Sequence, residues 1–271
     1  REELGVKKFA LLGTDYVYPR TTNKILEQYL KDKGISASDI FVNYTPFGHS
    51  DWSKIVSDVV ALGADGKKVG VISTINGDAN IGFYKELAAA NISADKIPVV
   101  AFSVGEEELS GLDTSNLVGH LAAWNYFQSA ESDINSEFIK AWKARMGNKR
   151  VTNDPMETHY IGFNMWVNAV KQAGTTNVNA VRTAMYGQKF PNLTGGTAEM
   201  LTNHHLSKPV LIGEIKADGQ FDIISQTEPV PGDAWTDFLA ESAVLKSDWK
   251  GLGCGMYNTN TKTCIQLKSN Y

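Results

Sequence analysis

The histidines and carboxylates of this sequence show no spacing that is typical of a catalytic or metal-binding site. His204 and His205 are adjacent, so on an extended chain their rings point to opposite faces. Glu157 and His159 lie two positions apart in a predicted helix, which also separates their side chains. The sequence contains no G-x-x-x-x-G-K-[ST], G-x-S-x-G or H-E-x-x-H motif. These patterns favour a binding protein over an enzyme, and they imply neither a cofactor nor a metal.

Polar and aromatic residues follow four predicted strands, at the point where each strand ends. They lie in the loops 13–20, 45–51, 73–80 and 103–106, which carry hydroxyls, amides, aromatic rings and glycines. In an open parallel sheet, ligands bind outside the carboxyl ends of the strands. We therefore expect a small, neutral, hydrogen-bonding ligand to be held against aromatic side chains at this edge.

The elements that position these loops alternate along the first hundred residues. Short apolar runs are typical of buried strands, and apolar residues at helical spacing indicate the helices between them. The strands are expected over 8–13, 39–44, 69–74 and 97–102, and the helices over 21–33, 51–62 and 81–90. This alternation predicts an α/β fold with a parallel sheet covered by helices on both faces.

The pattern changes after this part of the chain. One further strand is expected over 117–124, followed by helices over 132–146, 155–173 and 178–186. Beyond Pro191 the sequence indicates β-structure, and Asp218-Gly219 separates two apolar runs at 209–216 and 221–225. An Asp-Gly pair between such runs predicts a β-hairpin.

The composition is that of an ordinary globular protein. Of the 271 residues, 42% are hydrophobic and 21% are charged, and 26 basic residues face 30 acidic ones for a net charge of −4. This balance disfavours a nucleic-acid-binding protein, and no apolar run is long enough to span a bilayer. The first five residues lack the apolar core of a signal peptide, so the protein is either cytosolic or already separated from its leader.

The two cysteines, Cys254 and Cys264, lie close together near the end of the chain. A disulfide between them would close a short loop and contribute about 2–3 kcal/mol. Two sulfurs are too few for a structural zinc site. We expect a disulfide in an oxidising compartment, with two unpaired thiols as the alternative.

Several motifs resemble those of periplasmic urea and short-chain amide receptors, the solute-binding subunits of ABC transporters. The segments that carry this resemblance are Phe9–Thr21, Ser73–Asp78, Phe102–Leu109, Asp154–Glu157 and Asn203–Pro209. The resemblance implies the type I periplasmic binding protein fold, similar to leucine-binding proteins. That fold has two Rossmann-like lobes with parallel sheets, joined by three crossings and closing on the ligand between them.

The resemblance also implies a division of the chain. Residues 1–117 would form the second lobe, and 118–190 the closing, mainly helical part of the first lobe. Residues 191–229 would return to the second lobe as a β-hairpin, and 230–271 would form a C-terminal tail with the cysteine loop. The opening section of the first lobe would precede the first residue, so that lobe is expected to be incomplete in this chain.

By the same resemblance, the protein captures urea or a short-chain amide in an interlobe cleft and delivers it to a membrane permease. It would be exported to the periplasm and would bind no nucleic acid. The residues expected to contact the ligand are two tyrosines that close over a planar amide and four groups at neighbouring strand ends: Tyr16, Tyr18, Thr74, Asn76, Gly77 and Ser103.

Three alternatives stay open at this point. The first is a cytoplasmic amide sensor of the same fold, which the cysteine loop disfavours because the cytosol keeps thiols reduced. The second is a branched-chain amino-acid binding protein. The third is a small-molecule enzyme that uses Asp15 or Asp78 as a base, although neither residue pairs with a nucleophile or a metal.

Overall fold

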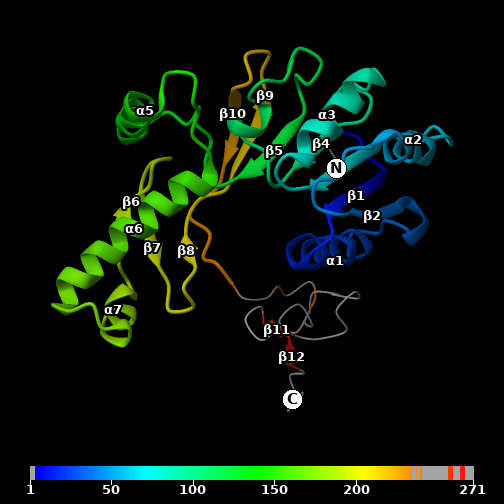
Figure 1. The fold of residues 1–271 in the computed structure, drawn as a ribbon. Helices are drawn as coiled ribbons and strands as arrows, with labels where there is room; N and C mark the ends of the chain where they lie inside the picture. The colour runs from blue at the N-terminus through cyan, green and yellow to red at the C-terminus, as the bar shows by residue number, and fades with distance from the viewer. Residues whose placement is uncertain (1–3, 234–235, 237–238, 240–255, 259–262, 266–271) are drawn as a thin grey trace.

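The computed structural model describes residues 4–233, 236, 239, 256–258 and 263–265. Figure 1 shows two bodies side by side, one built on a large twisted sheet and the other on three helices and a small sheet. The α/β fold class is confirmed. Within the described residues, no helix is both long and apolar enough to cross a bilayer.

The first body is a seven-stranded sheet in the order β10-β9-β5-β4-β3-β1-β2. Its strands are β1 (Lys8–Thr14), β2 (Ile40–Thr45), β3 (Val69–Thr74), β4 (Val99–Ala101), β5 (Leu121–Trp124), β9 (Leu211–Ile215) and β10 (Phe221–Gln226). The pairs among β1 to β5 are parallel, as expected. β9 is antiparallel to both β5 and β10, so the sheet is mixed rather than wholly parallel. The hairpin causes this difference, because it enters the sheet from the second body and reverses at Asp218-Gly219.

The predicted hairpin forms the edge of this sheet. Lys216 N–H donates to Gln220 O, which closes the turn between β9 and β10. The pairing of the two strands shifts between Ile223 and Ser225, where a β-bulge interrupts the ladder. Asp222 is exposed on β10, just before this bulge.

Helices cover both faces of the sheet, as the alternating pattern predicts. They are α1 (Val17–Asp32), α2 (Ser53–Leu62), α3 (Ala79–Ala89) and α4 (Glu106–Leu109), with a short 3₁₀ turn at Ala37–Asp39. Successive residues of β1 are buried on opposite faces: Leu11 packs in a cluster with Leu30 of α1, and Leu12 in a cluster with Phe83 of α3. α1 begins four residues before the expected start, because Pro19 is tolerated in a first helical turn, where its missing N–H needs no partner.

The second body consists of three helices and a small antiparallel sheet. Its elements are α5 (Asp133–Met146), α6 (Asp154–Ala173), α7 (Val178–Met185), β6 (Lys189–Pro191), β7 (Thr197–Met200) and β8 (Leu206–Ser207). The Ser132 side chain caps α5, and Asn153 caps α6 by accepting the Met156 N–H at 3.1 Å. Ile161 and Met165 of α6 pack against β7 to form a separate small core.

The expected lobe boundaries at residues 117, 190 and 229 stay predictions. β5 falls in the range 118–190 and pairs within the large sheet, whereas β7 and β8 fall in the range 191–229 and pair within the small one. In the tail, β11 (Met256–Asn258) pairs antiparallel with β12 (Thr263–Ile265). Cys254 lies outside the described residues and Cys264 is described only as a backbone position of β12, so the disulfide also stays a prediction.

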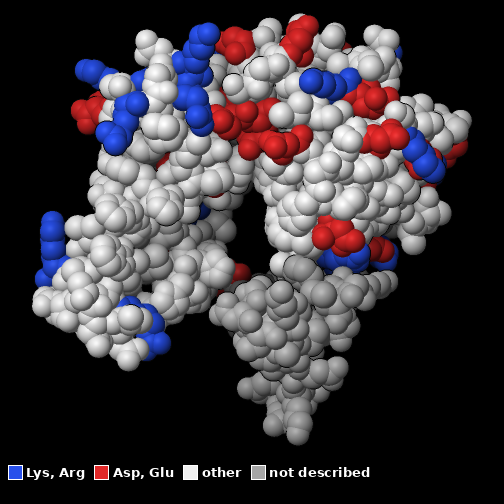
Figure 2. Space-filling model, in the orientation of Figure 1, with Lys and Arg blue, Asp and Glu red and all other residues white. Residues whose placement is uncertain are grey.

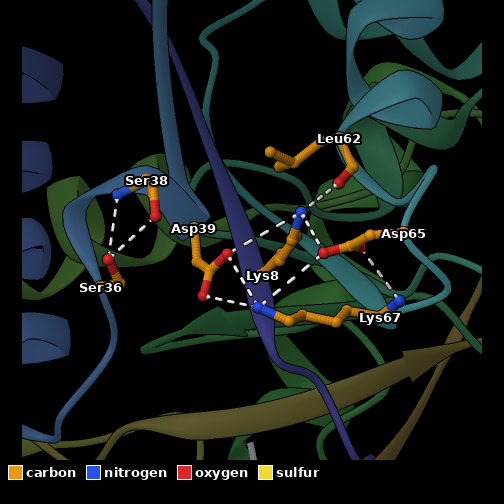
Figure 3. Close-up of polar contacts among 7 residues, drawn as sticks. All are labelled: Lys8, Ser36, Ser38, Asp39, Leu62, Asp65 and Lys67. Carbon is orange, nitrogen blue, oxygen red and sulfur yellow. Dashed lines mark hydrogen bonds and ion pairs between the residues drawn. The ribbon is translucent and has the colours of Figure 1, made fainter.

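A cluster of opposite charges lies at the amino edge of the large sheet, where β1, β2 and β3 begin (Figure 3). Lys8 is buried, and its ammonium group donates to Leu62 O at 2.8 Å and lies 3.0 Å from Asp65 and 3.8 Å from Asp39. Lys67 also contacts Asp39, at 3.2 Å. The cluster ties the residues before β2 and β3 to the first residue of β1, so we assign it a role in stability.

Replacing Lys8 with Ala should lower the free energy of unfolding by about 2 kcal/mol, because it removes charge-assisted hydrogen bonds and leaves Asp39 partly buried with fewer partners. Guanidinium chloride unfolding followed by circular dichroism measures this change. The matched control is Lys54→Ala: Lys54 pairs with Asp58 on α2 and its side chain is 84% exposed, so its loss should cost no more than about 0.5 kcal/mol. Equal effects of the two variants would contradict a special role for Lys8.

Candidate ligand-binding site

The strand order of the large sheet reverses at β1. The chain runs from β1 to β2 on one side and then crosses back to β3 on the other side of β1. The loops after β1 and β3 therefore diverge at the carboxyl edge, which is the position where open α/β sheets bind ligands. Asn76 N–H donates to Thr14 Oγ1 at 3.0 Å, which holds the two loops together at this point.

Tyr16 precedes α1 as its N-cap residue, and Tyr18 lies in the first turn of that helix, just after β1. Their ring centroids are 6.0 Å apart in an edge-to-face arrangement. The Tyr18 hydroxyl reaches the loop after β4, where it lies 3.3 Å from Ser103 Oγ and 3.4 Å from Phe102 O. Desolvation by burial raises the pKa of both phenols, so both stay protonated at neutral pH and can donate hydrogen bonds.

Phe47 extends this aromatic group on the loop after β2. Its ring centroid lies 4.9 Å from that of Tyr16, and the residue is 63% exposed. An aromatic residue so open to solvent at a strand end can form the outer wall of a binding site. Phe47 was not among the predicted site residues, although its loop, 45–51, was among those expected at this edge.

Thr74, Asn76 and Gly77 occupy the end of β3, but they present different groups to the edge. Thr74 is fully buried, and its hydroxyl lies 3.2 Å from both Leu12 O and Asn23 Oδ1. The half-buried Asn76 donates its side-chain amide to Thr74 O at 3.0 Å. Gly77 is exposed with a φ of +60°, so its backbone turns at a position that a larger side chain would adopt with strain. The roles of all three in ligand binding stay predictions.

Asn80 ties the loops after β3 and β4 to each other. It is fully buried at the start of α3, and its amide nitrogen donates to Ile75 O at 3.0 Å and to Ser103 O at 3.4 Å. The carbonyl oxygen of the same side chain is buried without a hydrogen-bond partner. Ser103 therefore has two links to other strand ends, one through its hydroxyl to Tyr18 and one through its carbonyl to Asn80.

Two charged groups at this edge, Arg20 and Asp15, are already engaged. Arg20 forms an ion pair with Asp15, and its guanidinium lies 4.6 Å from the ring centroid of Tyr44. Asp15 is one of the two carboxylates considered as an enzymatic base, and this pairing favours a structural role for it. Within the part of the chain that the structure describes, no group of three or more His, Cys, Asp or Glu side chains could hold a metal ion.

His120 has a structural role in the large sheet. It is fully buried just before β5, and its Nδ1 accepts the Val99 N–H at 3.1 Å. Desolvation lowers its pKa to about 4, so the ring stays neutral and serves as a hydrogen-bond acceptor for the sheet.

A hollow of about 650 Å³ lies away from this edge, on a face of the large sheet beside α1. Its lining is mainly apolar and includes Phe9, Leu30, Ile72 and Val100. An amide ligand would leave its polar groups without partners in such a groove. The carboxyl edge, with its phenols, amides and backbone groups, is therefore the better site for a small polar ligand.

The carboxyl edge faces the second body. The chain leaves the large sheet after β5 and returns to it after β8, so these two connections join the bodies on this side of the sheet. The segment 227–233, after β10, runs back beside the second connection and contacts the second body, where Asn203 donates its side-chain amide to Gly232 O. Figure 2 shows an opening between the two bodies in the viewed face. A ligand at this edge could therefore contact residues of both bodies.

Comparisons with known proteins agree with this arrangement. A family model described as a periplasmic binding protein domain matches residues 1–241. An amino acid ABC transporter substrate-binding protein from Pseudomonas fluorescens superposes with a TM-score of 0.69 at 18% identity, over 89% of this chain and 63% of that one. An ABC transporter solute binding protein from R. palustris, in complex with 4-hydroxybenzoate, superposes with a TM-score of 0.73 at 17% identity, over 85% of this chain and 62% of that one.

A curated relative matches a shorter part of the chain. It is a limonene hydroxylase from Geobacillus stearothermophilus, 33% identical over 134 residues, which are 49% of this chain and 24% of that protein. The chain thus spans about a quarter of this relative and less than two thirds of the two solved structures. The structural likeness, at these identities, establishes the fold.

Adding a side chain at Gly13 should disrupt the carboxyl edge. A Cβ there would lie 2.6 Å from Thr74 Oγ1 and 2.7 Å from Pro19 Cβ, both of which are held in place. We expect Gly13→Ala to lower the free energy of unfolding by about 1–3 kcal/mol, measured with guanidinium chloride because urea is itself a candidate ligand.

The matched control for this variant is Gly162→Ala. Gly162 lies inside α6, and a Cβ there would meet no atom within 4 Å. Alanine favours the helix, so this variant should raise the free energy of unfolding by up to about 1 kcal/mol. A neutral Gly13→Ala variant would contradict the close packing of β1 against Thr74.

Proposed function

The chain belongs to the periplasmic binding protein domain family, and from this premise we propose that it captures urea or a short-chain amide at the carboxyl edge of the large sheet. It then delivers the ligand to the membrane permease of an ABC transporter. The family consists of binding proteins, and the proposed role is accordingly one of capture rather than catalysis. The proposal places the protein in the periplasm and includes the disulfide between Cys254 and Cys264, which would form there.

The observation that carries this proposal is the contact of the protonated Tyr18 hydroxyl with the loop after β4, 3.3 Å from Ser103 Oγ. A planar amide offers a carbonyl acceptor and N–H donors, which hydroxyl, phenol and backbone groups at this edge can satisfy. Tyr16 and Phe47 would cover the flat faces of the ligand. A carboxylate ligand would need a cation, and Arg20 at this edge is engaged by Asp15 and Tyr44.

The proposed mechanism is closure of the two bodies on the ligand. A ligand that contacts both bodies only when they are closed shifts the equilibrium towards the closed form by its difference in affinity for the two forms. Tyr16, Tyr18, Asn76, Gly77 and Ser103 would supply the contacts from the large sheet. Thr74 would act by holding β3 against Asn23 rather than by contacting the ligand with its hydroxyl.

Two neighbouring aromatic residues of α6 are exposed on the second body. Phe163 and Trp166 on α6 stack on each other at 6.1 Å, and they are 56% and 45% exposed. Exposed stacked aromatic residues on a core helix mark a surface that packs against another element.

A second candidate ligand is an aromatic acid. The exposed ring of Phe47 beside Tyr16 favours it, because a benzoate ring could stack there. The 4-hydroxybenzoate complex of the protein from R. palustris provides the precedent for this fold.

Addition of urea, acetamide or formamide at about a hundred times its dissociation constant should stabilise the protein by about 2.7 kcal/mol. For a chain of this size, that is a rise of several degrees in melting temperature. Tyr18→Phe should weaken binding about threefold to tenfold, because it removes one hydrogen-bonding hydroxyl. Calorimetry on both proteins measures the affinities. Tyr29→Phe should leave them unchanged, because Tyr29 lines the hollow beside α1 and not the carboxyl edge.

The same panel discriminates between the ligand classes. A response to 4-hydroxybenzoate alone would replace the amide by an aromatic acid, and a response to leucine alone would replace it by a branched-chain amino acid. Free thiols at Cys254 and Cys264 in native material would favour the cytoplasmic sensor.

A further inference from the structure

Three ionisable side chains are buried together where the two bodies join. Asp154 and Glu157 lie in the first turn of α6 and are 8% and 0% exposed, and Lys208, just after β8, is 5% exposed. The Lys208 ammonium group donates to Glu157 Oε2. The other oxygen of Glu157 is buried without a hydrogen-bond partner. We call Asp154, Glu157 and Lys208 the junction cluster.

The junction cluster is attached to both connections between the bodies. Asn125, directly after β5, donates its backbone N–H to Asp154 Oδ2 at 3.1 Å. The side-chain amide of Asn125 donates to Pro209 O at 2.8 Å, on the other connection. Lys208 is itself part of that second connection and pairs with Val230 through two backbone hydrogen bonds. The cluster therefore contacts both connections at the point where they leave the large sheet.

The charges of the cluster do not balance when all three groups are ionised. Two carboxylates and one ammonium group carry a net charge of −1, which is costly in a buried site. Burial raises the pKa of Asp154 to about 6; Lys208 lowers this pKa and Glu157 raises it. Burial raises the pKa of Glu157 as well, again opposed by Lys208.

Other ionisable groups packed around the cluster add no positive charge. Tyr126 follows Asn125. Burial raises the pKa of its phenol, and the negative charges of Glu106 on α4 and of Glu157 raise it further. Burial raises the pKa of Glu106, whose carboxylate accepts hydrogen bonds from the N–H and hydroxyl of Ser129. Among these groups Lys208 is the one cation, so a proton is the natural species to cancel the excess negative charge.

We propose that the junction cluster is a proton-sensitive pivot, in which uptake of one proton strengthens the attachment of both connections to α6. This inference does not depend on the ligand of the carboxyl edge. It assigns to the junction a function that the binding site does not require, namely a dependence of the interlobe geometry on pH.

The direction of the pH effect follows from the raised pKa. Between about 3.8, the ordinary value, and about 6, the value in the folded protein, the folded state binds more protons at Asp154 than the unfolded state. The contribution of Asp154 to stability therefore improves as pH falls through 6 and reaches its full value below about 3.8. Above pH 6 the buried charge destabilises the folded protein.

The test compares Asp154→Asn with the wild-type full chain. The asparagine carbonyl can still accept the Asn125 N–H, but it carries no charge at any pH. We expect the folding equilibrium constant of the variant to exceed that of the wild type on the order of a hundredfold at pH 7.5, and only a few-fold at pH 4. Chemical unfolding at several pH values measures both constants, and Asp222→Asn, on the exposed face of β10, is the matched control.

Hydrogen exchange of the backbone amides in peptides covering 125–131 and 208–211 measures how firmly the two connections are held. At pH 7.5 these peptides should exchange more slowly in Asp154→Asn than in the wild type, while peptides from α2 should not differ. Lys208→Met provides a second readout, because loss of the ammonium group should move the midpoint of the wild-type pH dependence upward.

Two results would overturn the proposal. One is an Asp154→Asn variant that is less stable than the wild type at pH 7.5, or that differs from it equally at every pH. The other is exchange at the two connections that follows pH in the same way in Asp154→Asn as in the wild type. Should Lys208→Met fail to fold, the double variant Glu157→Gln with Lys208→Met removes the ion pair as a unit, and it should keep the pH dependence that comes from Asp154.

Discussion

Parallel strands can be joined only by connections that cross a face of the sheet, and the rest of this structure depends on that constraint. Each crossing returns the chain to the amino edge, so β1 to β5 all end at the opposite edge. Residues far apart in the sequence, such as Tyr18 and Ser103, therefore come within hydrogen-bond distance. The same constraint separates two tasks: the amino edge holds the charge cluster of Lys8, and the carboxyl edge holds the candidate site (Figures 1 and 3).

Among the residues that the structure describes, two lysines are buried, and they differ in the balance of charge around them. Lys8 meets two aspartates, and Lys67 supplies a second positive charge, so the group is neutral overall. Lys208 meets two buried carboxylates without a second cation. A balanced group stabilises the fold over a wide pH range, whereas an unbalanced one changes its state when a proton is available. The unbalanced group lies where the two bodies join. A change in its protonation therefore acts on the connections between them.

Sequence patterns predicted the elements well and the long-range pairings less well. The helix over 132–146 and the hairpin around Asp218-Gly219 follow from local signals, namely a Ser cap and a turn pair. No local signal indicates that β9 pairs with β5, because Leu121 and Glu214 are far apart in the chain. β8 has only two residues, which is too short for a recognisable alternation. The small sheet of the second body was for that reason expected only as unspecified β-structure.

The candidate site shows the same limit at the level of single residues. The family resemblance, together with the position at strand ends, selected Tyr18 and Ser103, which the fold brings together. It also selected Thr74, whose hydroxyl turns towards Leu12 O and Asn23 instead of the edge. Asn80 was missed because its importance comes from two carbonyl oxygens, on separate loops, that only the folded chain places within reach.

The bulge in β10 has a consequence for how this protein behaves among other copies of itself. β10 ends the large sheet, so its outer backbone groups have no neighbouring strand in that sheet. A regular edge of this kind is a template on which another chain can add a strand and begin to aggregate. The shift between Ile223 and Ser225 interrupts the spacing of these groups, and the exposed charge of Asp222 adds electrostatic repulsion. The outer strand of the sheet is thereby a poor template for intermolecular β-pairing.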